Sequence, residues 1–179
     1  TVVAPATVAD ARGMLAAALA DPDPVIVFEH VQLYNLEGEI AAGPVPLTGA
    51  AIRRVGGDLT LVTYGGSLPK TLEAAEALAR EGIEAEVIDL RTLRPYDAET
   101  LIASVNKTGR AVVATEAPKM GGLAAELSAT LSEECFSRLK APVVRVAGLD
   151  TPIPFSVPLE KLILPGKDDI LAGVKQALK

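Results

Sequence analysis

Residues 58–67, which read DLTLVTYGGS, decide the fold of this chain. The run from Leu59 to Tyr64 is typical of a strand, and the two glycines after it form a tight turn. Ser67 can cap a helix that runs to about Gly82, because a glycine is a natural C-terminal stop. A strand, a tight turn and a helix in this order indicate an α/β unit.

The same order of signals continues toward the C-terminus. Further strand signals lie at residues 84–90, 111–114 and 143–147, and helix signals at residues 95–109, 123–136 and 167–177. Because parallel strands need crossover connections, usually helices, this alternation predicts an α/β fold with a mostly parallel sheet.

The N-terminal part contains one helix and one strand. Residues 8–20 carry apolar side chains at helical spacing after Thr7, a suitable N-cap. Residues 25–28 form a continuous apolar run, which predicts a buried parallel strand. From residue 31 to residue 57 the periodicity fails and Gly and Pro are frequent, so we expect an interdomain connection there.

The first residues indicate a longer parent chain. Thr1 is not Met, and residues 2–4 look like the end of a strand with nothing before it. We expect a fragment of a longer protein; the alternative is removal of an initiator Met or a start that is not part of the sequence.

Composition excludes several classes of partner. The chain has 179 residues, of which 49% are hydrophobic, enough for one core plus a small appendage. A net charge of −6 argues against binding to nucleic acid or to an anionic membrane surface. No apolar run approaches the roughly 20 residues of a transmembrane helix. The single cysteine and the lack of a signal-peptide pattern favour a reducing compartment, and we expect a cytoplasmic protein.

The residues alone complete no catalytic site. His30, the only histidine, follows a predicted strand beside Glu29, where it could do acid–base work; a structural pair at a domain edge is the favoured interpretation. The glycine turn before Ser67 could bind an anion, but a tight turn explains it better. Cys135 follows two glutamates, which disfavour a thiolate, so we interpret it as a packing residue.

A family resemblance adds to this pattern. Residues 58–65 resemble the first strand and turn of the transketolase C-terminal domain. Residues 84–95, EAEVIDLRTLRP, are very similar to the next segment in beta subunits of thiamine-dependent 2-oxo acid dehydrogenases. Residues 104–108, 141–146 and 150–154 continue the resemblance. Upstream, residues 24–34, PVIVFEHVQLY, look like the end of that family's pyrimidine-binding domain.

The resemblance implies a domain organisation and an activity. Residues 1–34 would end a pyrimidine-binding domain, residues 35–57 would connect, and residues 58–179 would form a transketolase C-terminal-like domain with helices on both faces of its sheet. The family's α2β2 enzyme decarboxylates a 2-oxo acid on thiamine diphosphate, with Mg, and acylates a lipoyl group of an acyltransferase core. Its catalytic and cofactor-binding residues lie upstream of the segment resembling Thr1, so the resemblance assigns none here, and this piece alone would be inactive.

One site of the family falls within the chain. The resemblance implies a potassium site of backbone carbonyls and acidic groups at Ala18, Leu19, Asp21 and Asp23. Relatives often have an asparagine at the position of Asp23, and a further ligand lies upstream. From spacing alone, a solvated acidic turn is the alternative.

The resemblance also implies partners: an alpha subunit, a second beta subunit and the acyltransferase core. The core would dock near the C-terminus, on residues 149–179, where Glu160, Asp168 and Asp169 could attract a basic domain. A solvated helix end explains the same acids. The substrate stays open between pyruvate and branched-chain types, because residues 115–122 resemble the latter and residues 34–39 bacterial pyruvate or acetoin enzymes.

Two other functions remain open. One is the C-terminal domain of another thiamine enzyme, of the transketolase or deoxyxylulose-phosphate synthase type. The other is a binding module with no catalytic role.

Overall fold

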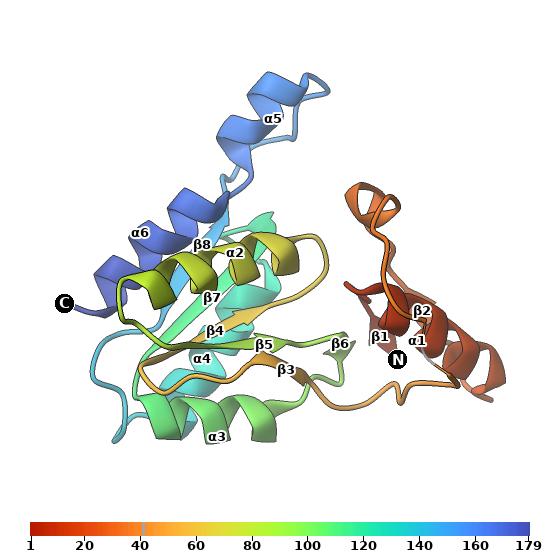
Figure 1. Ribbon diagram of the computed structural model, residues 1–179, viewed down its shortest axis with the longest axis horizontal. Helices are drawn as coiled ribbons and strands as arrows, with labels where there is room; N and C mark the ends of the chain where they lie inside the picture. The colour runs from red at the N-terminus through yellow and green to blue at the C-terminus, as the bar shows by residue number, and fades with distance from the viewer. Residues whose placement is uncertain (41) are drawn as a thin grey trace.

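The computed structural model describes residues 1–40 and 42–179, which fold into a larger and a smaller unit (Figure 1). Within these residues the larger unit is built on a five-stranded sheet in the order β3-β5-β4-β7-β8. Neighbouring strands are parallel except β3 and β5, which are antiparallel, so the prediction of a mostly parallel sheet is confirmed. The strands are β3 (Ala51–Arg54), β4 (Leu59–Thr63), β5 (Ala85–Asp89), β7 (Ala111–Pro118) and β8 (Val144–Gly148).

Helices cover both faces of this sheet, as Figure 1 shows. One face packs against α2 and α6, and the other against α3 and α4. Because successive strand residues point to opposite faces, Leu61 belongs to the first core and Val62 to the second. Every residue of β4 and of β5 is buried as a result. The helices are α2 (Ser67–Arg80), α3 (Ala98–Thr108), α4 (Leu123–Glu134) and α6 (Lys167–Ala177).

The smaller unit joins N-terminal residues to one strand of the larger part of the chain. Its elements are β1 (Val2–Val3), α1 (Val8–Ala20), β2 (Ile26–Val27), the short 3₁₀ helix η1 (Val31–Leu33) and β6 (Thr92–Arg94). β1 pairs in parallel with β2 and antiparallel with β6, so β6 ties the two units together. Thr7 caps α1 as predicted, because its hydroxyl oxygen accepts from the Asp10 backbone N–H at 3.1 Å.

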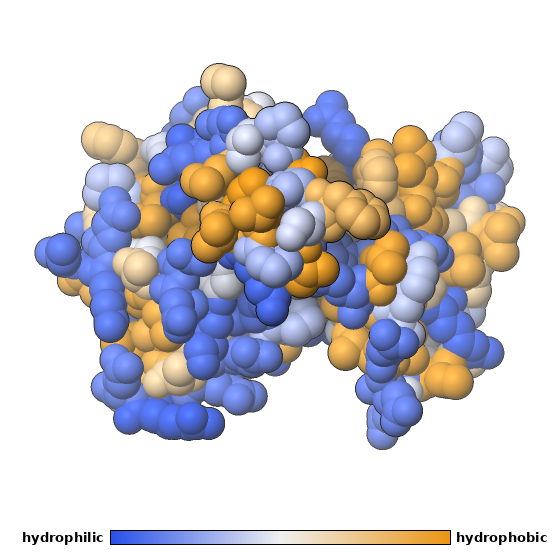
Figure 2. Space-filling model, turned by 90° about the horizontal axis from the view of Figure 1, so that it is seen from above, coloured by the Kyte–Doolittle hydropathy of each residue, from blue (hydrophilic) through white to orange (hydrophobic). Residues whose placement is uncertain are grey.

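Residues 149–164, which we call the arm, leave the larger unit and return to it. The arm contains α5 (Val157–Ile163) and projects away from both units in Figure 1. No residue of α5 is buried. Figure 2 looks down onto this side and shows apolar side chains gathered on the arm and on the smaller unit.

Parts of the chain differ from the sequence predictions. Residues 51–54, expected in the connection, form β3 at the edge of the larger sheet; Arg53 and Arg54 interrupt the apolar pattern that marks the other strands. Ala41, also in that connection, lies outside the described residues. The strand expected to be buried at residues 25–28 is instead an edge strand, with Ile26 54% and Phe28 58% exposed. The boundaries at residues 34 and 57 stay a prediction.

Candidate functional site

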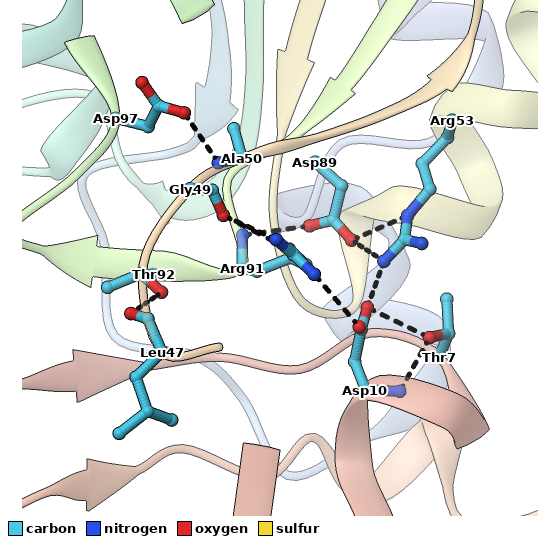
Figure 3. Close-up of polar contacts among 10 residues, drawn as sticks. All are labelled: Thr7, Asp10, Leu47, Gly49, Ala50, Arg53, Asp89, Arg91, Thr92 and Asp97. Carbon is cyan, nitrogen blue, oxygen red and sulfur yellow. Dashed lines mark hydrogen bonds and ion pairs between the residues drawn. The ribbon is translucent and has the colours of Figure 1, made fainter. Parts of the chain in front are cut away.

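The two units meet at a group of charged side chains that we call the Arg53 network (Figure 3). Arg53 of β3 donates from Nη2 to the carboxylates of Asp10, on α1, and Asp89, at the end of β5. The Asp89 contact is 2.9 Å long, and Arg53 Nε adds a second bond of 3.2 Å. Arg91 completes the network by donating Nη1 to Asp10 at 3.4 Å. Two carboxylates and two guanidinium groups therefore balance in charge between the units.

Burial makes this network sensitive to the loss of any one member. The Asp89 side chain is fully buried, and its burial raises the pKa above the ordinary value despite the hydrogen bonds from Arg53. For Arg53, burial would lower the pKa, but the hydrogen bonds and charges of Asp89 and Asp10 outweigh it and the pKa is raised. The guanidinium therefore stays charged where Asp89 needs a cation.

Further hydrogen bonds fix residues 47–50 beside the network. Arg91, which has a positive φ of 57°, donates Nη2 to the Gly49 carbonyl at 2.8 Å. The Thr92 hydroxyl donates to the Leu47 carbonyl at 2.7 Å, and the Ala50 N–H donates to Asp97 at 2.9 Å. The segment entering β3 is therefore held in place before the strand begins.

A second contact between the units lies at His30. Its Nε2 and Glu116 Oε2, on β7, are 2.7 Å apart, and Lys70 Nζ of α2 donates to Glu116 Oε1 at 2.7 Å. Burial would raise the pKa of Glu116, but the bonds from Lys70 and His30 outweigh it and the pKa is lowered. The imidazole lies against the backbone of Gly66, where an added Cβ would come within 2.3 Å of Nε2.

These residues border a cleft of about 320 Å³ between the units. Its walls are Ala4, Phe28 and Leu93 from the smaller unit and Tyr64 and Ala117 from the larger unit, with His30 and Glu116 beside them. Glu29 and Ser67 also line the cleft, so its polar side chains come from both units.

The structure settles how His30 is paired. Glu29, its neighbour in sequence, accepts instead from the Tyr34 hydroxyl at 2.7 Å. The partner of His30 is Glu116, 86 positions away, which no local pattern could have indicated. Among the described residues the buried Nδ1 of His30 has no hydrogen-bond partner. The expected structural pair of His30 with Glu29 is therefore wrong, because His30 pairs with a residue of the other unit.

The glycine turn and Cys135 behave as structural features. The Ser67 and Leu68 N–H groups donate to the Tyr64 and Gly65 carbonyls at 3.3 and 3.1 Å, so both are hydrogen-bonded within the turn. Cys135 is buried in the α3–α4 core, and burial together with Glu134 raises the pKa of its thiol, as a packing residue requires.

The predicted potassium ligands lie together at the C-terminal end of α1. Asp21 is the C-cap, and its Oδ1 accepts from the Asp23 N–H at 2.9 Å. Leu19 is 81% exposed, and the last carbonyls of a helix, such as those of Ala18 and Leu19, lack helical partners. The part of the chain that the structure describes, the end of α1 included, holds no group of three or more His, Cys, Asp or Glu side chains suited to a metal. The potassium site stays a prediction.

In residues 1–40 and 42–179, no helix is both long and apolar enough to cross a membrane.

The sheet order, its helical cover and the matched residues define the class of protein. Residues 49–170 match the family model described as "Transketolase, C-terminal domain", and the chain belongs to this family. The match begins two residues before β3, which agrees with a larger sheet that includes this strand.

Known relatives extend the similarity over nearly the whole chain. The beta subunit of acetoin:2,6-dichlorophenolindophenol oxidoreductase from Cupriavidus necator is 45% identical over 99% of this chain and 53% of its own length. The pyruvate dehydrogenase E1 component beta subunit from Bacillus subtilis is 43% identical over 99% of this chain and 55% of its own length. The chain therefore spans about half the length of these relatives.

A solved structure has the same fold. A chain described as a split gene transketolase in an inactive beta4 tetramer is 31% identical, with a TM-score of 0.81, over 99% of this chain and 56% of its own. Because the similarity covers both units, the arrangement of the smaller unit on the larger recurs in that protein.

Proposed function

We propose that this chain is the C-terminal part of the beta subunit of a thiamine-dependent 2-oxo acid dehydrogenase. The observation that carries the proposal is identity of 43–45% to beta subunits over 99% of the chain, across both units and the junction between them. The pyruvate dehydrogenase relative supports a 2-oxo acid such as pyruvate as the substrate class.

The described residues do not fit thiamine diphosphate and its magnesium ion. They hold no group of three metal-binding side chains. The Ser67 and Leu68 N–H groups at the start of α2 already donate to carbonyls of the preceding turn. We therefore derive no catalytic step from these residues. Their role in the proposed enzyme is assembly: the smaller unit and the arm expose apolar side chains that suit contact with an alpha subunit and a second beta subunit.

Docking of the lipoyl acyltransferase core on residues 149–179 is part of the proposal. Glu160, Asp168 and Asp169 line one hollow of about 510 Å³ together with Lys70, Lys161 and Lys167, so acidic and basic side chains lie side by side there. Asp169 also accepts from the Gly166 N–H at 2.8 Å to cap α6, which leaves Glu160 and Asp168 as the acids available to a basic partner. Charge reversal of these two residues should weaken docking and lower its salt dependence.

We also propose the potassium site at Ala18, Leu19, Asp21 and Asp23. Replacing Asp21 with Ala should abolish any rise in the melting temperature of the full-length subunit caused by potassium over sodium, while Asp168→Ala should preserve it. Equal effects of the two salts on the unmodified subunit would contradict the site.

The test of the proposed function uses the full-length beta chain together with its alpha subunit. We expect 2-oxo acid decarboxylation that depends on thiamine diphosphate and on both subunits. Absence of this activity with every 2-oxo acid tested would overturn the proposal. The isolated chain should bind thiamine diphosphate weakly or not at all, and tight saturable binding in calorimetry would contradict that expectation.

The other two functions are less well supported. The split gene transketolase shares 31% identity with this chain, against 43–45% for the dehydrogenase and acetoin relatives. Activity of the full-length subunits on sugar phosphates in place of 2-oxo acids would favour a transketolase. A stand-alone binding module predicts that no thiamine-dependent activity appears with any partner.

A further inference from the structure

The cleft between the two units has walls suited to an organic ligand. It remains where the smaller unit covers the carboxyl ends of β4 and β7, and its volume is about 320 Å³. Phe28 and Leu93 contribute apolar surface from the smaller unit, and Tyr64 contributes an aromatic ring from the larger unit. Cavities of this order hold small organic molecules, whose apolar parts leave water on binding.

The charged side chains that line the cleft are acidic, as far as the structure describes the chain. They are Glu29 from the smaller unit and Glu116 from β7. Lys70 and His30 each donate to a different oxygen of Glu116, and an ionised carboxylate accepts about four hydrogen bonds, so both oxygens can accept a further donor. Lys70 does not line the cleft, so a ligand there contacts the two carboxylates and not the lysine.

The negative charge of Glu116 acts on the other groups of the cleft. Burial raises the pKa of Tyr64, and the charge of Glu116 raises it further. Because the pKa of Glu116 is itself lowered despite its burial, this carboxylate stays ionised. A positive group in the cleft is therefore favoured, and aromatic rings such as those of Phe28 and Tyr64 attract cations as well.

One polar side chain in the wall of the cleft has no partner. Ser67 lines the cleft and is only 3% exposed, and its hydroxyl forms no hydrogen bond within residues 1–40 and 42–179. Its backbone groups are occupied, because the N–H donates to the Tyr64 carbonyl and the carbonyl accepts from the Thr71 hydroxyl. Buried polar groups are nearly always paired, and a hydroxyl oxygen can accept an N–H group. A ligand in the cleft can supply that donor.

We propose that the cleft binds a small primary ammonium compound with an apolar body. The ammonium group donates to Glu116 and to the Ser67 hydroxyl, and the apolar body lies against Phe28 and Leu93. An anionic ligand would meet two carboxylates, and a neutral ligand would supply no positive charge to them. The site is independent of the proposed dehydrogenase activity. Because both units contribute to it, the bound ligand stabilises the junction between them.

Four probes of similar shape test the charge and the donor. Phenethylammonium has the required group, 2-phenylethanol is its neutral counterpart, phenylacetate is its anionic counterpart, and the N-trimethylated form keeps the charge without an N–H group. Calorimetric titration of the full-length subunit should show saturable binding of phenethylammonium, with dissociation constants about tenfold or more higher for the other three. The proposal is overturned if phenethylammonium shows no saturable binding, or if any of the other three binds equally well.

Two variants place the binding in the cleft. Ser67→Ala removes the hydroxyl and should raise the dissociation constant of phenethylammonium about fivefold, while Glu116→Gln removes the charge and should raise it about tenfold or more.

Ser132→Ala is the matched control, because Ser132 is exposed on α4 and its hydroxyl already donates to the Ser128 carbonyl at 2.6 Å. Glu116→Gln also weakens the contact with His30, so Ser67→Ala is the deciding variant, and unchanged affinity in it contradicts the site. Because calorimetry does not depend on catalysis, either result leaves the proposed function to its own decarboxylation assay.

Discussion

Replacing Arg53 with Met tests whether the Arg53 network holds the two units together. Met keeps much of the apolar stem but removes the guanidinium, so the fully buried carboxylate of Asp89 loses its side-chain donor. Removing one partner of a buried ion pair costs about 3–5 kcal/mol, because the remaining charge is left in a medium of low dielectric constant. Arg91 still donates its backbone N–H to Asp89 at 3.2 Å, so we expect the lower end, about 3 kcal/mol.

Urea unfolding followed by circular dichroism measures this loss directly. In a chain of this size each kcal/mol corresponds to about 2–4 °C in the melting temperature, so the variant should melt about 6–12 °C lower. Arg54→Met is the matched control on the same strand: the carboxylate partner of Arg54, Glu84, is 54% exposed, and such pairs contribute about 0–1 kcal/mol.

A double variant separates the charge effect from simple loss of packing. Arg53→Met combined with Asp89→Asn replaces the stranded carboxylate with a neutral amide and should regain about 1 kcal/mol or more relative to Arg53→Met alone. The reasoning is refuted if Arg53→Met and Arg54→Met lose equal stability, or if the double variant recovers none.

Three further predictions follow from single positions. Gly66→Ala should displace the only imidazole of the chain, because the new Cβ would lie 2.3 Å from His30 Nε2; unchanged His30 signals in NMR spectra would contradict this. Glu86→Gln should flatten the acid limb of the stability–pH curve. Burial would raise the pKa of Glu86, but the hydrogen bonds from Lys107 and Ser104 outweigh burial and the pKa is lowered. The stability that Glu86 contributes is therefore full above pH 4.5, its ordinary pKa, and is lost as the pH falls through the lowered pKa of the folded state. Cys135 should react with a thiol reagent only as fast as the chain unfolds, and rapid labelling of the folded chain would show that its burial is wrong.

The sequence predicts most of the larger sheet because its central strands are buried on both faces. β4 and β7 read as apolar runs, and turns mark their ends. β3 could not be predicted, because it is an edge strand and is not buried on both faces. Its Arg53 contacts Asp10 of the smaller unit, and its pairing with β5 joins residues far apart in the sequence, such as Ile52 and Ile88, which are 36 positions apart. An edge strand stabilised by such contacts has no local signal.

The contacts between the units could not be predicted for the same physical reason. Asp10 lies in the first turn of α1, and its partner Arg53 lies 43 positions away. His30 was singled out because it is the only histidine, while Glu116 and Lys70 come from two other elements. The packing of the two units decides which charged side chains meet, and no local sequence pattern indicates this packing.

Both contacts lie at the carboxyl ends of the parallel strands. Asp89 ends β5, Gly66 follows β4, and Glu116 lies in the last part of β7. Open α/β sheets bind their ligands at this edge. In this protein the chain's own N-terminal unit occupies it, through a buried charge network on one side and the His30–Glu116 pair on the other. The edge that would bind a ligand in other open α/β sheets therefore holds a neighbouring unit of the same chain here.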